Sequence, residues 1–117
     1  VAEAIVRAAV QAAQEQHVKA ILVFTMTGTT ARMLAKLRPS RPILALTADP
    51  RVARQMALFW GVEPFFTHTG HTTDDMIELG ERTLLKAGRL KKGDTVVVVA
   101  GTQRLRGATN MMKFLTL

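Results

Sequence analysis

Short, continuously apolar segments alternate in this chain with longer segments whose apolar residues recur at helical spacing. The continuous runs are typical of strands buried on both faces of a parallel sheet, and the helical spacing predicts amphipathic helices. We expect strands at residues 20–24, 43–46, 62–67, 95–100 and 111–117, and helices at residues 2–16, 31–37, 51–60 and 73–86. Helices that alternate with strands in this way favour a three-layer α/β/α sandwich around a mostly parallel sheet.

The last two predicted strands are joined differently from the others. The connection Gly101 to Gly107 is too short for a crossover helix, so the segment 111–117 should run antiparallel to its neighbour. That final segment is apolar apart from Lys113 and two threonines, and an edge strand with so little charge invites pairing with another subunit. Self-association through the last strand is therefore expected.

Three residues give further detail on where individual helices and strands begin or lie. Asp49 followed by Pro50 is typical of a helix start, with the aspartate as N-cap and the proline in the first turn. Pro64 cannot donate to a sheet ladder, so the third strand is expected at an edge or in an irregular position. Trp60 closes an amphipathic helix and is expected in the core.

Length and charge narrow the class of protein. The 117 residues suit one domain, 1–117, and no apolar run approaches the length of a membrane helix. The chain lacks cysteine, which excludes disulfides and thiolate sites and is compatible with a cytoplasmic setting. Its net charge of +7 comes from residues 1–48 and 101–117, which predicts an anionic partner. Nucleic acid is the less favoured partner, because the chain has no Tyr, one Trp and five Phe for base stacking.

A polar loop after the first strand is the main candidate site. It links a buried strand to a helix start, where free backbone N–H groups and the helix dipole favour a phosphate oxygen. Glycine in such a loop permits close approach of the backbone, and threonine hydroxyls add donors. The loop consists of Thr25, Met26, Thr27, Gly28, Thr29 and Thr30. The alternative is ordinary N-capping by Thr29 or Thr30, with the other threonines solvated.

The loop after the fourth strand is expected to meet the same anion. Arg104 and Arg106 would supply guanidinium groups that match phosphate geometry, and Gly107 ends this loop. In an open α/β sheet, ligands bind beyond the carboxyl ends of the strands where the winding direction reverses. If the first strand is central, both loops flank that reversal.

A metal-dependent enzyme is a separate hypothesis. His68 and His71 lie three residues apart, and Asp74 and Asp75 follow them. Zinc sites need a rigid set of three or four ligands, whereas this segment is expected to be a loop that runs into a helix start. We therefore expect no metal site.

The blocks TMTGTTAR, KLRPSRPILALT, VARQMALFWGVEP, KKGDTVVVVAG and GATNMMKFLTL stand in an order that resembles the C-terminal domain of pyruvate kinases. The resemblance covers essentially the whole chain. It implies a five-stranded mixed sheet of order 3-2-1-4-5 with strand five antiparallel. It also implies the effector-binding and subunit-contact domain of a homotetrameric, cytoplasmic glycolytic enzyme that converts phosphoenolpyruvate and ADP to pyruvate and ATP. In that family the loop matching Thr25 to Thr30 holds an effector phosphate, and the loop matching Gly101 to Gly107 closes over the ligand.

The resemblance also implies what this chain lacks. The family's catalytic lysine, and the carboxylates of an enzyme expected to use Mg²⁺ and K⁺, belong to a barrel domain absent here. No catalytic residue and no cofactor are therefore expected in this chain. Family members that bind fructose 1,6-bisphosphate carry a Trp and an Arg near the fourth helix, but residues 70–79 contain neither. A sugar monophosphate or AMP is the favoured effector, and fructose 1,6-bisphosphate is kept as a less favoured alternative.

Overall fold

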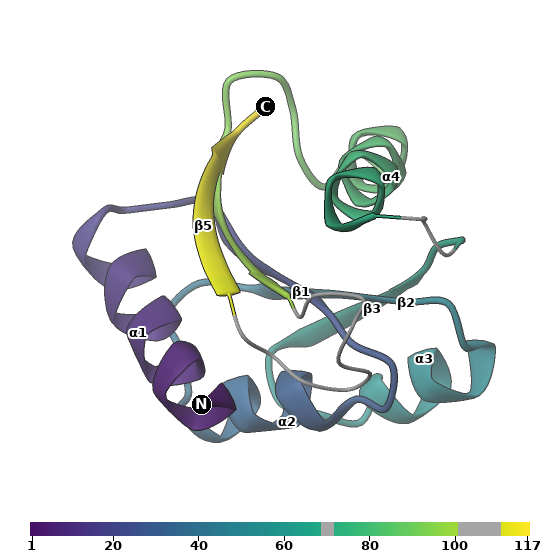
Figure 1. The fold of residues 1–117 in the computed structure, drawn as a ribbon, viewed down its shortest axis with the longest axis horizontal. Coiled ribbons are helices and arrows are strands. Elements are labelled where there is room, and N and C mark those ends of the chain that lie inside the picture. The colour runs from purple at the N-terminus through teal and green to yellow at the C-terminus, as the bar shows by residue number, and fades with distance from the viewer. Residues whose placement is uncertain (69–71, 101–110) are drawn as a thin grey trace.

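The computed structural model describes residues 1–68, 72–100 and 111–117 (Figure 1). Helices and strands alternate along the chain until β4 is followed by β5. The elements are α1 (Ala2–Glu15), β1 (Ala20–Phe24), α2 (Thr29–Lys36), β2 (Ile43–Thr47), α3 (Pro50–Met56), β3 (Val62–Phe66), α4 (Thr73–Lys86), β4 (Thr95–Ala100) and β5 (Met111–Thr116). All five predicted strands and all four predicted helices are present, with shifted boundaries.

The strands form one mixed sheet of order β3-β2-β1-β4-β5. β1 pairs in parallel with both β2 and β4, and β2 pairs in parallel with β3. β5 pairs antiparallel with β4, with Val97 opposite Phe114. The predicted fold class and strand order are therefore confirmed. β3, which carries Pro64, lies at an edge as expected.

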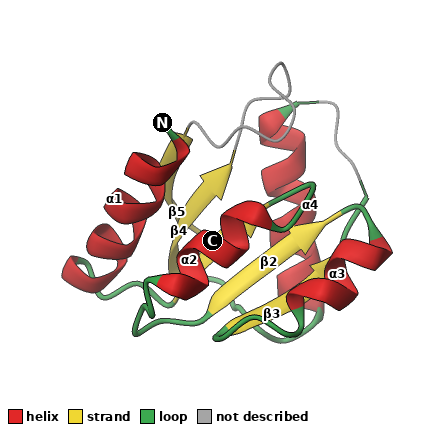
Figure 2. Cartoon of the chain, turned by 90° about the horizontal axis from the view of Figure 1, so that it is seen from below, coloured by secondary structure: helices red, strands yellow, loops and turns green. Residues whose placement is uncertain are grey.

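Side chains from the two faces of the sheet form two separate cores. In β1, Ile21 and Val23 belong to the core shared with α1, α2 and α3, whereas Leu22 and Phe24 belong to the core shared with α4. Figures 1 and 2 show the same division, with three helices on one side of the sheet and α4 on the other. This is why the strand sequences are continuously apolar, because both faces of the central strands are covered.

α4 approaches the sheet closely at Gly80. A Cβ built at that glycine would lie 2.6 Å from Cζ and 2.8 Å from Cε1 of Phe24. Phe24 is the last residue of β1 and directly precedes the candidate loop. The glycine therefore makes room for the aromatic ring that anchors the end of β1.

Two expectations about helix ends are wrong. α2 begins at Thr29 and not at residue 31, because Gly28 takes a left-handed conformation and serves as the N-cap. α3 ends at Met56 and not near Trp60, so the tryptophan leaves the amphipathic pattern. Trp60 is 50% exposed, and the guanidinium carbon of Arg38 lies 4.7 Å from its ring centroid. It stacks with a cation at the surface instead of joining the core.

In the part of the chain that the structure describes, no helix is long and apolar enough to cross a membrane.

Candidate anion-binding site at the carboxyl edge of the sheet

The candidate loop leaves the carboxyl end of β1, the central strand. β2 and β3 lie on one side of β1, and β4 and β5 lie on the other. The chain therefore reverses its winding direction next to β1, which is where open α/β sheets bind ligands. The expected position of the loop is confirmed by this strand order.

Hydrogen bonds within the loop shape its turn. The backbone N–H of Gly28 donates to Oγ1 of Thr25 over 2.9 Å. Oγ1 of Thr27 lies 3.0 Å from Oγ1 of Thr29, and the N–H of Thr29 donates to Thr27 Oγ1 over 3.4 Å. These bonds hold Thr27 and Thr29 side by side at the start of α2.

Gly28 is the residue that lets this turn lie against α3. Its φ of 88° falls in the left-handed region, which favours glycine. A Cβ at this position would lie 3.4 Å from Cγ of Met56 and 3.5 Å from Cγ1 of Val52, both on α3. A larger residue would meet strain from its backbone, whereas its Cβ would make only van der Waals contacts with α3.

The threonines differ in their access to solvent. Thr27 and Thr29 are exposed, Thr25 is partly buried, and Thr30 is only 6% exposed. Met26 is also exposed, and its thioether offers an anion no strong donor. The hydroxyls of Thr27 and Thr29 are therefore the ones best placed to meet a ligand from solvent.

The start of α2 differs from the starts of α3 and α4. Asp49 accepts a hydrogen bond from the N–H of Arg51 at the start of α3, and Thr72 accepts one from the N–H of Asp75 at the start of α4. The N-cap residue of α2 is Gly28, which has no side chain, and Oγ1 of Thr27 accepts the N–H of the first helical residue, Thr29, over 3.4 Å. The predicted alternative of N-capping by Thr29 or Thr30 is thus wrong, because both lie inside the helix. Because a glycine and not a carboxylate stands at this N-cap, the partial positive charge of the helix start favours an anion.

At the start of the neighbouring helix α3, the carboxylate of Asp49 already accepts a hydrogen bond from the backbone. The hydrogen bond from the Arg51 N–H holds the pKa of Asp49 below its usual value, and the nearby Arg51 guanidinium acts in the same direction. The two groups lie 2.9 Å and 3.7 Å from Oδ1 of Asp49. A carboxylate thus occupies the start of α3 in the way that a ligand anion could occupy the start of α2.

Arg32 is a cation near this site that the sequence analysis did not single out. It is the fourth residue of α2, its side chain is exposed, and its N–H donates to the carbonyl of Gly28 over 3.0 Å. The charge distribution of the sequence indicates a cationic site in this region, because no Asp or Glu occurs between Glu15 and Asp49. A basic residue in the first turn of the helix adds positive potential to the loop.

Some predicted residues lie outside the described residues. These are Arg104, Arg106 and Gly107 of the second loop, and His71 of the proposed metal cluster. His68 makes an edge-to-face contact with Phe66, with ring centroids 5.4 Å apart. The described residues contain no group of three or more His, Asp or Glu side chains that could hold a metal ion.

Fold and site together define a class of protein: an α/β/α sandwich with a glycine-capped helix start at its topological switch point. Comparison with known sequences is more specific. Residues 3–115 match the family "Pyruvate kinase, alpha/beta domain". The chain belongs to this family, and it corresponds to the C-terminal domain of these enzymes.

Individual relatives agree with that assignment. The chain is 38% identical to a pyruvate kinase of Lactococcus lactis over 116 residues, which cover 99% of this chain and 23% of that protein. It is 42% identical to a pyruvate kinase of Lactobacillus delbrueckii over 114 residues, which cover 97% of this chain and 19% of that protein. The chain therefore spans about a fifth of the length of these relatives.

Proposed function

We propose that this chain is the effector-binding domain of a cytoplasmic, glycolytic pyruvate kinase and that it holds the phosphate of its effector at Thr25–Thr30. The parent reaction would transfer a phosphoryl group from phosphoenolpyruvate to ADP. That chemistry, with its Mg²⁺ and K⁺, is assigned to a barrel domain that lies outside residues 1–117. The chain itself would regulate and would not catalyse.

The observation that carries this proposal is the glycine-capped start of α2, where the hydroxyls of Thr27 and Thr29 are exposed to solvent. A phosphate is a dianion near neutral pH, and it accepts hydrogen bonds from backbone N–H and hydroxyl groups. The Thr27 and Thr29 hydroxyls lie 3.0 Å apart at that helix start. Arg32 adds a nearby positive charge, and the left-handed Gly28 keeps the turn free of a side chain.

The loop of residues 101–107 would supply the remaining contacts to the effector phosphate. Arg104 and Arg106 would pair with phosphate oxygens, and Gly107 would end the loop that folds over the ligand. This part of the proposal comes from the family resemblance and from the charge of residues 101–117. An Arg fork suits phosphate because two parallel N–H donors match two oxygens.

A monophosphate suits this chain better than a bisphosphate. The first turn of α4 carries Asp74 and Asp75, and two carboxylates would repel a second phosphate in that direction. Residues 72–79 contain no Lys or Arg that could offset them. A sugar monophosphate or AMP is thus the proposed effector, with fructose 1,6-bisphosphate less favoured.

Regulation would follow from assembly into a homotetramer. β5 is at the edge of the sheet, so its outer side is open to pairing with β5 of a second copy. An effector changes activity only if it binds one arrangement of the subunits more tightly than the other. Contacts through β5 would transmit the state of the effector loop to neighbouring subunits.

Titration calorimetry with a hexose monophosphate, AMP and fructose 1,6-bisphosphate tests the phosphate site. We expect Thr27→Ala combined with Thr29→Ala to weaken monophosphate binding about a hundredfold, since each of the two lost hydrogen bonds to a charged group is worth about 1.5 kcal/mol. Thr116→Ala on β5 is the matched control and should bind as the unmodified chain does. Equal affinity of the double variant and the unmodified chain would remove the loop from the proposal.

A further inference from the structure

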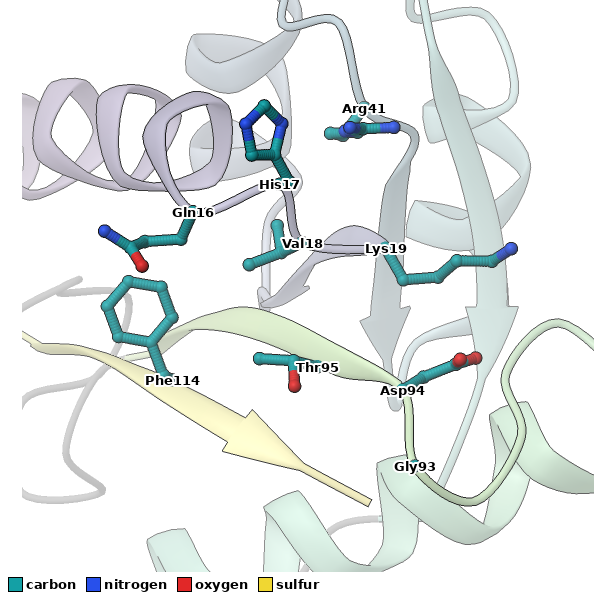
Figure 3. A pocket seen from close by; sticks show the side chains of 9 residues that line it. All are labelled: Gln16, His17, Val18, Lys19, Arg41, Gly93, Asp94, Thr95 and Phe114. Atoms are coloured by element: carbon teal, nitrogen blue, oxygen red, sulfur yellow. The ribbon is translucent and has the colours of Figure 1, made fainter.

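A separate pocket lies at the amino edge of the sheet, at the opposite end of β1 from the candidate loop. It forms where the end of α1 meets the starts of β1 and β4 and the middle of β5 (Figure 3). Its volume is about 610 Å³, within the range of small-molecule sites. The residues that matter for its chemistry are His17, Lys19, Arg41, Asp94 and Phe114.

The pocket contains cations without counter-ions. Arg41 is partly buried, yet neither it nor Lys19 forms a salt bridge with a carboxylate in the described ranges 1–68, 72–100 and 111–117. Among the described residues that line the pocket, Asp94 is the one acidic residue, and its Oδ2 accepts the backbone N–H of Lys91 over 2.9 Å. Positive charge therefore exceeds negative charge in this hollow.

An aromatic ring lies on the other side of the same hollow. Phe114 is 46% exposed although its strand belongs to the sheet. Figure 3 shows its ring beside Gln16, across the pocket from Lys19 and Arg41. A partly exposed phenyl ring offers a face on which a planar group can stack. One wall is thus aromatic and the opposite wall is cationic.

The backbone at His17 is unusual for its residue type. His17 has a φ of 52° and follows α1 in the position where glycine is the common residue. The N–H of Val18 donates back to the carbonyl of Ala13 over 3.4 Å, which closes the helix end. A non-glycine residue in this conformation costs on the order of 1 kcal/mol. Strained positions of this kind cluster at ligand sites, and His17 lines the pocket.

We propose that this amino-edge pocket binds a phosphomonoester that also carries a planar aromatic group, such as a nucleoside monophosphate. Arg41 and Lys19 pair with the phosphate, and the ring of Phe114 stacks on the planar group. Guanidinium groups favour phosphate because their N–H donors match its oxygens. The proposal does not depend on the effector loop, because the two sites lie at opposite ends of the parallel strands.

Amide chemical shifts of the isotopically labelled chain locate the binding of three probes: AMP, adenosine and inorganic phosphate. We expect AMP to shift the resonances of residues 16–19, 41, 94–95 and 114. Its affinity should exceed that of adenosine and of phosphate at least tenfold, because the nucleotide uses both walls of the pocket. Arg41→Ala should weaken AMP binding about tenfold, and Phe114→Leu should weaken it while leaving phosphate binding unchanged. Arg54→Ala, an exposed substitution on α3, is the matched control and should have no effect.

Each other result overturns the proposal in a recognisable way. Shifts confined to residues 25–32 would place the nucleotide at the effector loop alone, which would support the proposed function and refute the second site. Phosphate binding as tight as AMP binding would refute the stacking on Phe114. Full AMP affinity in the Arg41→Ala variant, or no shift at the pocket at all, would refute the site itself.

Discussion

Replacing Gly80 with alanine tests the packing that positions the end of β1. Gly80 lies in the middle of α4 and has a helical backbone, so alanine introduces no dihedral strain there. The added Cβ would nevertheless lie 2.6 Å from Cζ of Phe24 and 3.3 Å from Cδ2 of Leu46. Real Cβ atoms do not approach a ring carbon so closely, so α4 or the phenyl ring must move.

Two opposing effects decide the outcome. Alanine is favoured over glycine in a helix by about 1 kcal/mol. Overpacking a core costs about 1–3 kcal/mol. Phe24 is 8% exposed, and its rigid ring is enclosed by the sheet and α4, so the clash is not easily relieved. The cost of overpacking should therefore lie in the upper part of its range, at about 2–3 kcal/mol. After the helix gain of about 1 kcal/mol is subtracted, we expect Gly80→Ala to lower the free energy of unfolding by about 1–2 kcal/mol.

Urea denaturation of single and double variants measures this balance. Phe24→Leu shortens the side chain and removes the clashing Cζ and Cε1 atoms, at the cost of a cavity. In a double-mutant cycle, Gly80→Ala should therefore be much less destabilising in the Phe24→Leu background. Because Thr25 directly follows Phe24, we also expect Gly80→Ala alone to weaken binding at the effector loop.

Gly88→Ala is the matched control. Its Cβ would meet nothing within 4 Å, but its φ is 74°, so its cost comes from the backbone and not from packing. That cost should be the same with phenylalanine or leucine at position 24. A Gly80→Ala variant as stable as the unmodified chain, or one with no coupling to Phe24, would refute the close approach described for α4.

Three further predictions concern helix ends. His17→Gly should raise the free energy of unfolding by about 1 kcal/mol in urea denaturation, because glycine adopts the φ of 52° without strain; an unchanged midpoint would contradict this. Asp49→Ala should lower the melting temperature at pH 7. Because the pKa of Asp49 is lowered in the folded chain, its contribution to stability is present above the unfolded pKa and is lost as the pH falls through the folded pKa. The difference in melting temperature between the variant and the unmodified chain should therefore shrink in acid. A difference independent of pH would refute the charged cap. Arg38→Ala should cost about 0.5–1 kcal/mol through its lost stacking on Trp60, and tryptophan fluorescence should report the change; an unaltered spectrum would contradict the contact.

Much of the fold could be predicted from the chain alone. Continuous apolar runs mark strands buried on both faces, and β1 and β4 begin and end where those runs do. Asp49 before Pro50 marks the start of α3, because the cap and the missing proline N–H act locally. The antiparallel direction of β5 follows from the short connection before it. These features depend on neighbours in sequence, so local patterns suffice.

Helix boundaries required more than pattern. Gly28 adopts a left-handed φ of 88° as the N-cap residue, and that turn places the start of α2 at Thr29. Trp60 was expected in the core, yet it lies at the surface against Arg38 because α3 ends at Met56. Neither outcome is visible in the local pattern of apolar residues.

Residues a few positions apart set the helices and strands, their order along the chain and the polar loop after β1, so these features could be predicted from the sequence. Tertiary structure alone decided which hydroxyls reach solvent: Thr27 and Thr29 do, while Thr30 is buried. It also decided that Lys19, Arg41 and Phe114, far apart in the chain, surround one pocket. The physical reason is that burial and convergence depend on how α1, β1 and β5 pack, and a linear pattern does not contain those distances.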